Sequence, residues 1–555
     1  AFCRRYGIHY SRPGNGISHY VHLERFARPG RLMIGADSHT STAGAAGVLA
    51  IGVGGLEVAV AMAGHSFELP RPVVVGVELT GRLARRVQAK DVVLELLRRH
   101  GVRGGVGRVF EFHGPGVETL SVTERATICN MVVETGGTTG VFPSDERTRG
   151  WLHRQHRPDH FEPLAADDRA SYDEQESIDL SALEPLVARP SSPGDVVTVR
   201  ELAGLELGQV CVGSSVNSSY EDLATVGATL RDRTVHPDID LTVTPGSRQI
   251  LDTIVQSGVY GELVEAGARM LEPICGPCIG VGQAPAGGVP SLRTFNRNFP
   301  GRSGTQGDQV YLCSPATAAA SALTGRLTDP RDLEGELSLR PPPERLRIDD
   351  RHILAPEPGP VELPRGENIV DPPRGRAPEE DLEAPVLIVV GDDISTGDMA
   401  PDGALGMALW GNIPACARFM FRRLDPSFHD RATEAEQGLV VAGENYGQGS
   451  SREQAALAAL HLGVRAVIAK SFARIHRRNL ALNGIVPLRF SDPGDYDGVS
   501  EGDVWRIEGL RSAISSGGSV TTSTGVELCV ELLAGEREPV LAGGLRELLM
   551  GTSSA

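Results

Sequence analysis

Lysine is almost missing from this 555-residue chain, which has only Lys90 and Lys470 and otherwise takes its positive charge from arginine. The formal net charge is −17 and the pI is about 5.4, so basic groups are too few to neutralise a nucleic-acid backbone. We see no basic stripe with interleaved aromatic residues, which argues against RNA binding. The sequence has no apolar run of 18 or more residues and no signal peptide. These features predict a cytoplasmic protein with no membrane or nucleic-acid partner.

Cysteine is also scarce, with eight residues in the whole chain, so a disulfide scaffold is excluded. The close pair Cys275 and Cys278 then indicates metal ligands or buried thiols. The chain opens on Ala1 and is already inside a motif by Tyr10. This start predicts a fragment whose first domain lacks an N-terminal segment.

Short β-branched apolar runs alternate with helical stretches along most of the chain, which predicts a multi-domain α/β fold. Val73–Leu79 is an expected strand and Ala89–Arg99 the helix after it, and the apolar run Val386–Val390 is expected to start a further α/β unit after the linker. Pro341–Pro385 is rich in Pro, Glu and Arg without periodicity, which is typical of an extended linker. The predicted parts are a remainder of a first α/β domain (1–72), a second α/β domain (73–190), a third (191–340), the linker (341–385) and a C-terminal swivel or lid domain (386–555).

Cys275-Gly276-Pro277-Cys278 is the strongest single motif, because Gly and Pro impose a turn that can point two thiolates at one iron or zinc centre. A redox-inert pair or a thioredoxin-like disulfide remains the alternative. A thioredoxin motif opens a helix, however, whereas Ile279-Gly280-Val281-Gly282 follows here.

Asp37-Ser38-His39 follows the apolar run Leu32–Ile34, so it is expected at a strand end, where α/β sites gather. Together these side chains can orient a substrate and move a proton. Ordinary turn chemistry is the alternative for three polar residues in this position.

Arg297 and Arg302 lie on either side of a Pro-Gly turn in Asn296–Arg302. Planar guanidinium groups clamp carboxylates well, although surface loops also carry such arginines. A second candidate anion site is Glu444–Arg452, a glycine-containing loop between an expected strand and an expected helix. Its serines, Ser450 and Ser451, have the alternative role of capping that helix.

The order of these motifs resembles the aconitase family, in the bacterial forms of its mitochondrial type, over essentially the whole chain. The motifs that carry the resemblance are Asp-Ser-His (37–39), Ala-Thr-Ile-Cys-Asn (126–130), Cys-Gly-Pro-Cys (275–278), Asn-Arg-Asn-Phe-Pro-Gly-Arg (296–302) and Gly-Ser-Ser-Arg-Glu (449–453). The resemblance implies three α/β domains around a 4Fe–4S cluster, closed by a mobile lid after the linker. One iron then serves as a Lewis acid toward the substrate.

Carried over position by position, the resemblance implies a role for each of the following residues. Ser450 is the base that removes a proton from carbon, and the acid–base network consists of His19, Asp37, His39 and Glu134. The substrate-binding residues are Ser38, Arg297, Arg302, Ser451 and Arg452. Cys275 and Cys278 are cluster ligands, with Asn130 and Asn296 beside the cluster.

Several positions depart from the family pattern. Ser215 stands where the family has its remaining cluster cysteine, and Cys211 is near in sequence but would need a shifted backbone to replace it. In the lid, Gly397 and Asp398 replace an aspartate and a histidine, Trp410 aligns with an arginine that contacts substrate, and Gln454 replaces a histidine.

These observations predict a monomeric hydro-lyase that uses an iron–sulfur cluster to move water on a citrate-like di- or tricarboxylic acid. The alternative is a cluster-deficient, non-catalytic homologue that binds an anion or a protein partner. The substituted positions keep both hypotheses open at the level of the sequence.

Overall fold

The computed structural model describes residues 1–167, 169–357, 359–401 and 403–552, and the chain divides into two compact units. The first unit contains Ala1–Ile51 and Pro72–Pro364, and the second contains Gly52–Arg71 and Arg365–Ala555. Both units mix helices with mainly parallel sheets, which confirms the predicted α/β class. Across the described ranges, no helix has the length and apolar character needed to cross a membrane.

A four-stranded parallel sheet in the order β6-β5-β4-β7 forms one part of the first unit. Its strands are β4 (Val73–Thr80), β5 (Arg108–His113), β6 (Thr139–Val141) and β7 (Glu174–Asp179). Helix α4 (Ala89–His100) follows β4, so the strand and helix expected at these positions are confirmed. Helix α5 (Val122–Met131) begins at a capping box in which the Ser121 hydroxyl accepts the Glu124 amide while the Glu124 carboxylate accepts the Ser121 amide.

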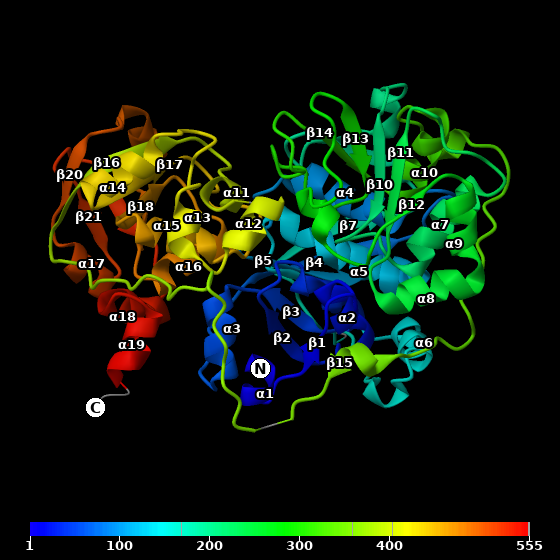
Figure 1. The fold of residues 1–555 in the computed structure, drawn as a ribbon, viewed down its shortest axis with the longest axis horizontal. Coiled ribbons are helices and arrows are strands. Elements are labelled where there is room, and N and C mark those ends of the chain that lie inside the picture. Colours follow the sequence, from blue (N-terminus) through cyan, green and yellow to red (C-terminus); the bar gives the residue numbers. More distant parts are fainter. Residues whose placement is uncertain (168, 358, 402, 553–555) are drawn as a thin grey trace. The chain divides into compact units, whose positions relative to one another are not determined.

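A seven-stranded sheet in the order β12-β11-β10-β13-β14-β8-β9 forms the other part, with β10, β11 and β13 side by side in Figure 1. Its strands are β8 (Leu186–Ala188), β9 (Val196–Thr198), β10 (Gln209–Gly213), β11 (Asp240–Thr244), β12 (Arg269–Met270), β13 (Pro290–Arg293) and β14 (Gln309–Cys313). The helices that follow these strands are α7 (Tyr220–Leu230), α8 (Arg248–Ser257), α9 (Val259–Glu265) and α10 (Pro315–Thr324). One apolar core runs between the two sheets, from Val75 and Phe110 to Phe295 and Leu312.

The N-terminal part of the first unit is built from short elements. They are α1 (Phe2–Tyr6), β1 (Tyr10–Ser11), α2 (Ser18–Arg25), β2 (Leu32–Gly35), β3 (Leu49–Gly52) and, further along the chain, α6 (Glu146–Arg154) and β15 (Ile353–Leu354). Strand β1 pairs antiparallel with β15, so the first residues of the chain and the residues near 353 are joined within this unit.

The second unit has one seven-stranded sheet in the order β20-β16-β17-β18-β19-β22-β21. Its strands are β16 (Leu382–Val390), β17 (Gly438–Ala442), β18 (Val464–Ala469), β19 (Val486–Phe490), β20 (Val504–Ile507), β21 (Ser519–Thr521) and β22 (Glu527–Val530). Its helices are α3 (Gly55–Met62), α11 (Thr396–Met399), α12 (Gly403–Leu409), α13 (Ile413–Ala417), α14 (Phe428–Ala435), α15 (Gln454–His461), α16 (Arg474–Leu482), α17 (Leu510–Ser516), α18 (Ala534–Ala542) and α19 (Leu545–Thr552).

Strand β16 begins at Leu382, four residues before the strand expected at Val386–Val390. The extra residues, Leu382–Pro385, pair antiparallel with β20 at the edge of the sheet. Proline is tolerated in such a strand at positions that need no donor, so Pro385 does not mark its start. Helix α3 reaches this unit from the N-terminal third of the chain, and the Glu453 carboxylate accepts its Leu56 amide at 2.6 Å.

Candidate active site

Asp37 lies just after β2 and links two histidines of the first unit. Its Oδ2 is 2.7 Å from Nδ1 of His19 on α2, and its Oδ1 accepts the backbone amide of His39 at 3.0 Å. Burial alone would lower the pKa of His19, but the Asp37 carboxylate and the Ser215 carbonyl raise it above the ordinary value. Burial also opposes the charge on Asp37, yet His19 and His39 hold its pKa well below the usual range. His19 is therefore kept protonated beside an ionised carboxylate.

Glu134 joins His39 to Arg297 in a buried cluster. His39 Nε2 is 2.9 Å from Glu134 Oε1, and Arg297 Nε donates to Glu134 Oε2 at 3.0 Å. A terminal nitrogen of Arg297 also donates to the Ser38 hydroxyl at 3.2 Å. Burial raises the pKa of Glu134, but Arg297 and His39 outweigh it and lower that pKa. Burial and the Arg297 charge lower the pKa of His39, so this ring is neutral where His19 is charged.

The amide of Asn296 gathers side chains from four segments. Its nitrogen lies 2.8 Å from the Ser215 hydroxyl, 3.1 Å from the Asn130 carbonyl oxygen and 2.9 Å from His39 Nε2. Asn130, on α5, donates to the Ser215 backbone carbonyl at 3.2 Å. Asn296 follows β13 and Ser215 follows β10, so adjacent parallel strands deliver both residues to one edge of the sheet.

Cys275 and Cys278 lie on a 3-10 turn, Gly276–Ile279, in the same part of the unit. Cys278 is buried and its thiol donates to the side-chain oxygen of Asn296 at 3.4 Å, while Cys275 is exposed. A hydrogen bond from Cys275 and the nearby Arg302 guanidinium lower the pKa of Cys278 below the ordinary thiol value.

The chemistry of this donor set decides whether it fits the cluster that the resemblance implies. Fe–S clusters are held by thiolates, and these side chains supply two thiols and the Ser215 hydroxyl. Among the residues that the structure describes, no three His, Cys, Asp or Glu side chains come together in a geometry that could hold a metal ion. The residues present therefore do not fit a cluster held by three thiolates.

Hydrogen bonds, ion pairs and electrostatic contacts connect the predicted site residues of the first unit into one network. The residues so connected are His19, Asp37, Ser38, His39, Asn130, Glu134, Ser215, Cys275, Cys278, Asn296, Arg297 and Arg302. The other predicted residues belong to the second unit, where each is described on its own.

Ser450, Ser451 and Arg452 lie in a loop of the second unit before α15. Helix α15 has Glu453 at its N-cap position and no side-chain cap, so neither serine serves as the helix cap. Arg452 is largely buried, donates to the Ala400 carbonyl at 3.2 Å, and places its guanidinium 5.6 Å from the ring centre of Trp410. The carboxylate of Asp398 is engaged by Ser395 and Arg423.

Lys90 was not singled out from the sequence as a site residue, although it supports the site directly. It is fully buried on α4, and its amine donates to the carbonyls of Thr294 and Phe295 at 2.9 and 2.7 Å. These carbonyls immediately precede Asn296 and Arg297. The rarity of lysine in the chain was the one available signal.

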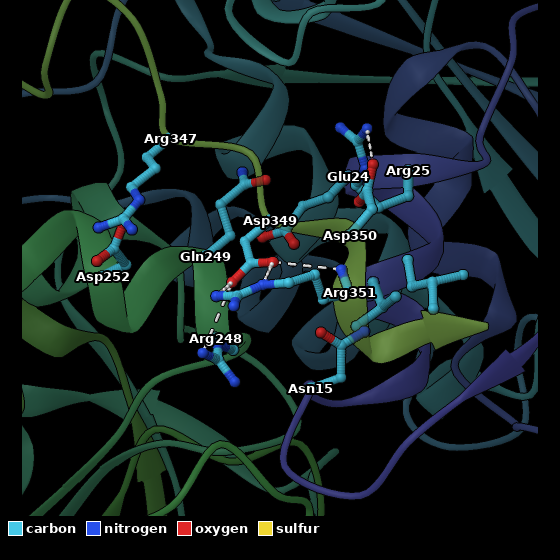
Figure 2. Close-up of a pocket in the computed structure, with 12 residues that line it drawn as sticks. Asn15, Glu24, Arg25, Arg248, Gln249, Asp252, Arg347, Asp349, Asp350 and Arg351 are labelled. Carbon is cyan, nitrogen blue, oxygen red and sulfur yellow. Dashed lines mark hydrogen bonds and ion pairs between the residues drawn. The ribbon is translucent and has the colours of Figure 1, made fainter.

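A separate hollow of about 100 Å³ lies on the first unit, lined mainly by charged side chains (Figure 2). Arg25 pairs with Asp350 at 2.8 Å, and Arg351 and Arg248 both pair with Asp349. None of the predicted site residues is among those that line it. These ion pairs hold the segment before β15 against α2 and α8, which is a structural role.

Comparisons with known proteins identify the family. The model of the aconitase family (aconitate hydratase) matches residues 1–325, and the model of the aconitase C-terminal domain matches residues 425–493. The chain is 36% identical over 605 residues to a putative mitochondrial aconitate hydratase of Aspergillus fumigatus, covering 95% of this chain and 76% of that protein. It is 34% identical over 576 residues to the mitochondrial aconitate hydratase of Gracilaria gracilis (92% and 73%). The same identity over 585 residues relates it to a mitochondrial homocitrate dehydratase of Saccharomyces cerevisiae (93% and 74%).

These matches and the α/β scaffold place the chain in the hydro-lyase class of enzymes. The chain belongs to the aconitase family. The expectation of a cytoplasmic protein is wrong, because the relatives named above are mitochondrial proteins. Absence of a recognisable targeting segment in the given sequence was a poor basis for that expectation.

Proposed function

We propose that this chain catalyses the reversible dehydration and hydration of a citrate-like di- or tricarboxylic acid. The observation that carries the proposal is the buried Glu134 carboxylate, which lies between the His39 imidazole and the Arg297 guanidinium. An arginine held in this way can bind a substrate carboxylate beside a proton-transfer group. Relatives named aconitate hydratase and homocitrate dehydratase support the same substrate class.

Dehydration removes a proton from one carbon and a hydroxyl group from its neighbour, leaving a double bond and water. The leaving hydroxyl needs a proton, and His19 is the suitable donor because Asp37 keeps it charged. His39 stays neutral, and Glu134 fixes its ring orientation. In this proposal His19, kept charged by Asp37, supplies the proton, while His39, held by Glu134, orients the hydroxyl.

Carboxylate binding is assigned to the arginines. Arg297 and Arg302 clamp substrate carboxylates, and Ser38, which already accepts from Arg297, adds a hydroxyl donor. From the second unit the resemblance assigns Ser450 as the base that takes the carbon-bound proton, with Ser451 and Arg452 as further substrate contacts. The positive charge of Arg452 favours the ionised form of a nearby hydroxyl, which suits Ser450 for this role.

A 4Fe–4S cluster bound at this site would supply a Lewis acid for the leaving hydroxyl. We propose that Cys275 and Cys278 are the thiolate ligands available to such a cluster in this chain. Ser215 adds a hydroxyl and not a third thiol. The catalytic roles proposed above are therefore assigned to the chain's own side chains and do not depend on a cluster.

The test is an assay of the full chain, reconstituted without oxygen, against citrate, isocitrate, homocitrate and a dicarboxylic hydroxy acid. Formation of the unsaturated acid is followed by its ultraviolet absorbance and confirmed by mass spectrometry. We expect turnover of at least one tricarboxylic acid, in both directions, with loss of turnover in Arg297→Met. Tight binding of these acids without any turnover, by the folded and reconstituted chain, would support the non-catalytic homologue and contradict the proposal.

A further inference from the structure

Ser215 and Cys278 both form hydrogen bonds with the side chain of Asn296. The amide nitrogen of Asn296 donates to the Ser215 hydroxyl at 2.8 Å, and the amide oxygen accepts from the Cys278 thiol at 3.4 Å. Cys275 immediately precedes the 3-10 turn that carries Cys278. Two sulfurs and one oxygen therefore lie in the same part of the first unit.

The loop that carries Ser215 is firmly held. The Ser218 hydroxyl donates to the Ser214 carbonyl at 2.6 Å, and the Ser218 backbone amide donates to the Tyr20 hydroxyl at 2.9 Å. His19 Nε2 lies 2.6 Å from the Ser215 carbonyl. Positive φ angles of 75° at Ser214 and 54° at Asn217 define the turn. The backbone that carries the Ser215 side chain is thus held by contacts within this unit.

Cys211 cannot replace the hydroxyl without breaking the sheet. It lies inside β10, paired with Thr242 of β11 on one side and Arg293 of β13 on the other. Its side chain is almost fully buried in the core between the two sheets. A third thiolate from this residue would require strand β10 to leave its ladder.

Thiol and hydroxyl differ sharply as iron ligands. A free cysteine ionises near pH 8.5, whereas a serine hydroxyl keeps its proton at physiological pH and is a harder donor. We propose that Ser215 alone limits the iron content of this site, so that the chain holds a substoichiometric or oxygen-labile cluster and Ser215→Cys completes it. The proposal deepens the proposed function, since it concerns the same site and rests on that assignment.

The experiment measures iron and acid-labile sulfide per chain after identical anaerobic reconstitution of the parent and Ser215→Cys with ferrous iron and sulfide. We expect the variant to hold about four irons, as a 4Fe–4S cluster requires, and the parent to hold less than about half of that. During timed exposure to air, the parent should lose its iron at least several-fold faster than Ser215→Cys does. Visible charge-transfer absorbance should rise in proportion to iron.

A matched control distinguishes the effect of placing a thiol at position 215 from the effect of adding a thiol anywhere in the loop. Ser218→Cys adds a thiol to the same loop, but its side chain points to the Ser214 carbonyl, so iron should stay at the parent level. Cys278→Ser placed on top of Ser215→Cys should return iron to the parent level or below. Equal gains in Ser215→Cys and Ser218→Cys would overturn the proposal.

Two further results also overturn it. One is a parent chain that already carries a full iron complement and keeps it in air, a result that stands even if Ser215→Cys folds poorly. The other is a folded Ser215→Cys that holds no more iron than the parent. Iron is counted without turnover, so a variant that fills with iron yet processes no tricarboxylic acid sinks the proposed function and leaves this inference intact.

Discussion

The amine of Lys90 donates to the backbone carbonyl of Phe295 at 2.7 Å in the interior of the first unit. The adjacent Thr294 carbonyl takes a second bond from the same amine. A buried cation thereby fixes the backbone just ahead of Asn296 and Arg297. Its acceptors are these two backbone carbonyls and the side-chain oxygen of Asn217, with no carboxylate among them, so the position of the site loop and the ionisation of Lys90 are coupled.

Lys90→Met is expected to change how stability depends on pH. Burial lowers the pKa of Lys90 to about 7, below its unfolded value of about 10.4. Between these values the unfolded chain binds one more proton than the folded chain, so the free energy of unfolding rises with pH across that window. The variant lacks this rise, and the parent-minus-variant difference should grow by about 4 kcal/mol from pH 7 to 10. Urea titrations at several pH values, with Lys470→Met as the control, measure it, and parallel curves would contradict it.

Glu134→Gln is expected to separate turnover from affinity. The substitution keeps the volume but removes the charge that orients His39, and turnover should fall about 100-fold or more. It also removes a negative charge beside Arg297, so the dissociation constant for a tricarboxylate should not rise. Steady-state rates and calorimetric titration test the two parts. Glu118→Gln, at an exposed position of the same unit, should leave both unchanged.

Trp410→Ala is expected to weaken anion binding through Arg452. The guanidinium lies 5.6 Å from the ring centre, an arrangement worth about 0.5–2 kcal/mol, so affinity should drop about 2- to 30-fold. Trp410→Phe keeps an aromatic face and should recover most of the affinity. Calorimetric titration with citrate decides the matter, and equal affinity in Trp410→Ala and the parent would show that the ring does not orient Arg452.

Asp145→Ala is expected to destabilise the first unit by about 3 kcal/mol. Arg125 is fully buried and donates two hydrogen bonds to the Asp145 carboxylate, at 3.0 and 2.6 Å. Removal of this carboxylate leaves the buried guanidinium without its counter-charge. The exposed pair of Arg189 and Asp195 provides the control, since Asp195→Ala should change stability by no more than about 1 kcal/mol. Chemical denaturation of both variants tests the contrast, and equal losses would refute it.

The sequence was most informative where hydrophobic periodicity is strong. Strand β4 and helix α4 were predicted within one residue of their ends, because Val73–Leu79 is a short, valine-rich apolar run and Ala89–Arg99 has an amphipathic period. Strand β16 was predicted to start too late, because the edge pairing that admits Pro385 is a long-range contact. Local propensity carries no information about such a partner.

The same distinction holds for the site. Asp37, Cys278 and Asn296 could be predicted as candidates from local motifs and from the family order, and the resemblance linked Glu134 to His39. The hydrogen bond from Arg297 to Glu134 and the buried contacts of Lys90 join residues more than 100 positions apart. No local sequence motif predicts such contacts. The roles of these residues in catalysis stay predictions until the variants are measured.

The second unit is assembled from two separate stretches of chain, since α3 enters it from residues 52–71. Leu56 donates to Glu453, Glu57 pairs with Arg478, and Arg474 donates to the Gly52 carbonyl at 2.8 Å. A C-terminal fragment that begins at Arg365 therefore lacks the segment with α3, to which its own Glu453, Arg474 and Arg478 side chains bind in the full chain. Protease cleavage at residues 359–364 should give two pieces that co-elute until denaturant is added, and the isolated C-terminal piece should refold only when a peptide spanning 52–71 is supplied.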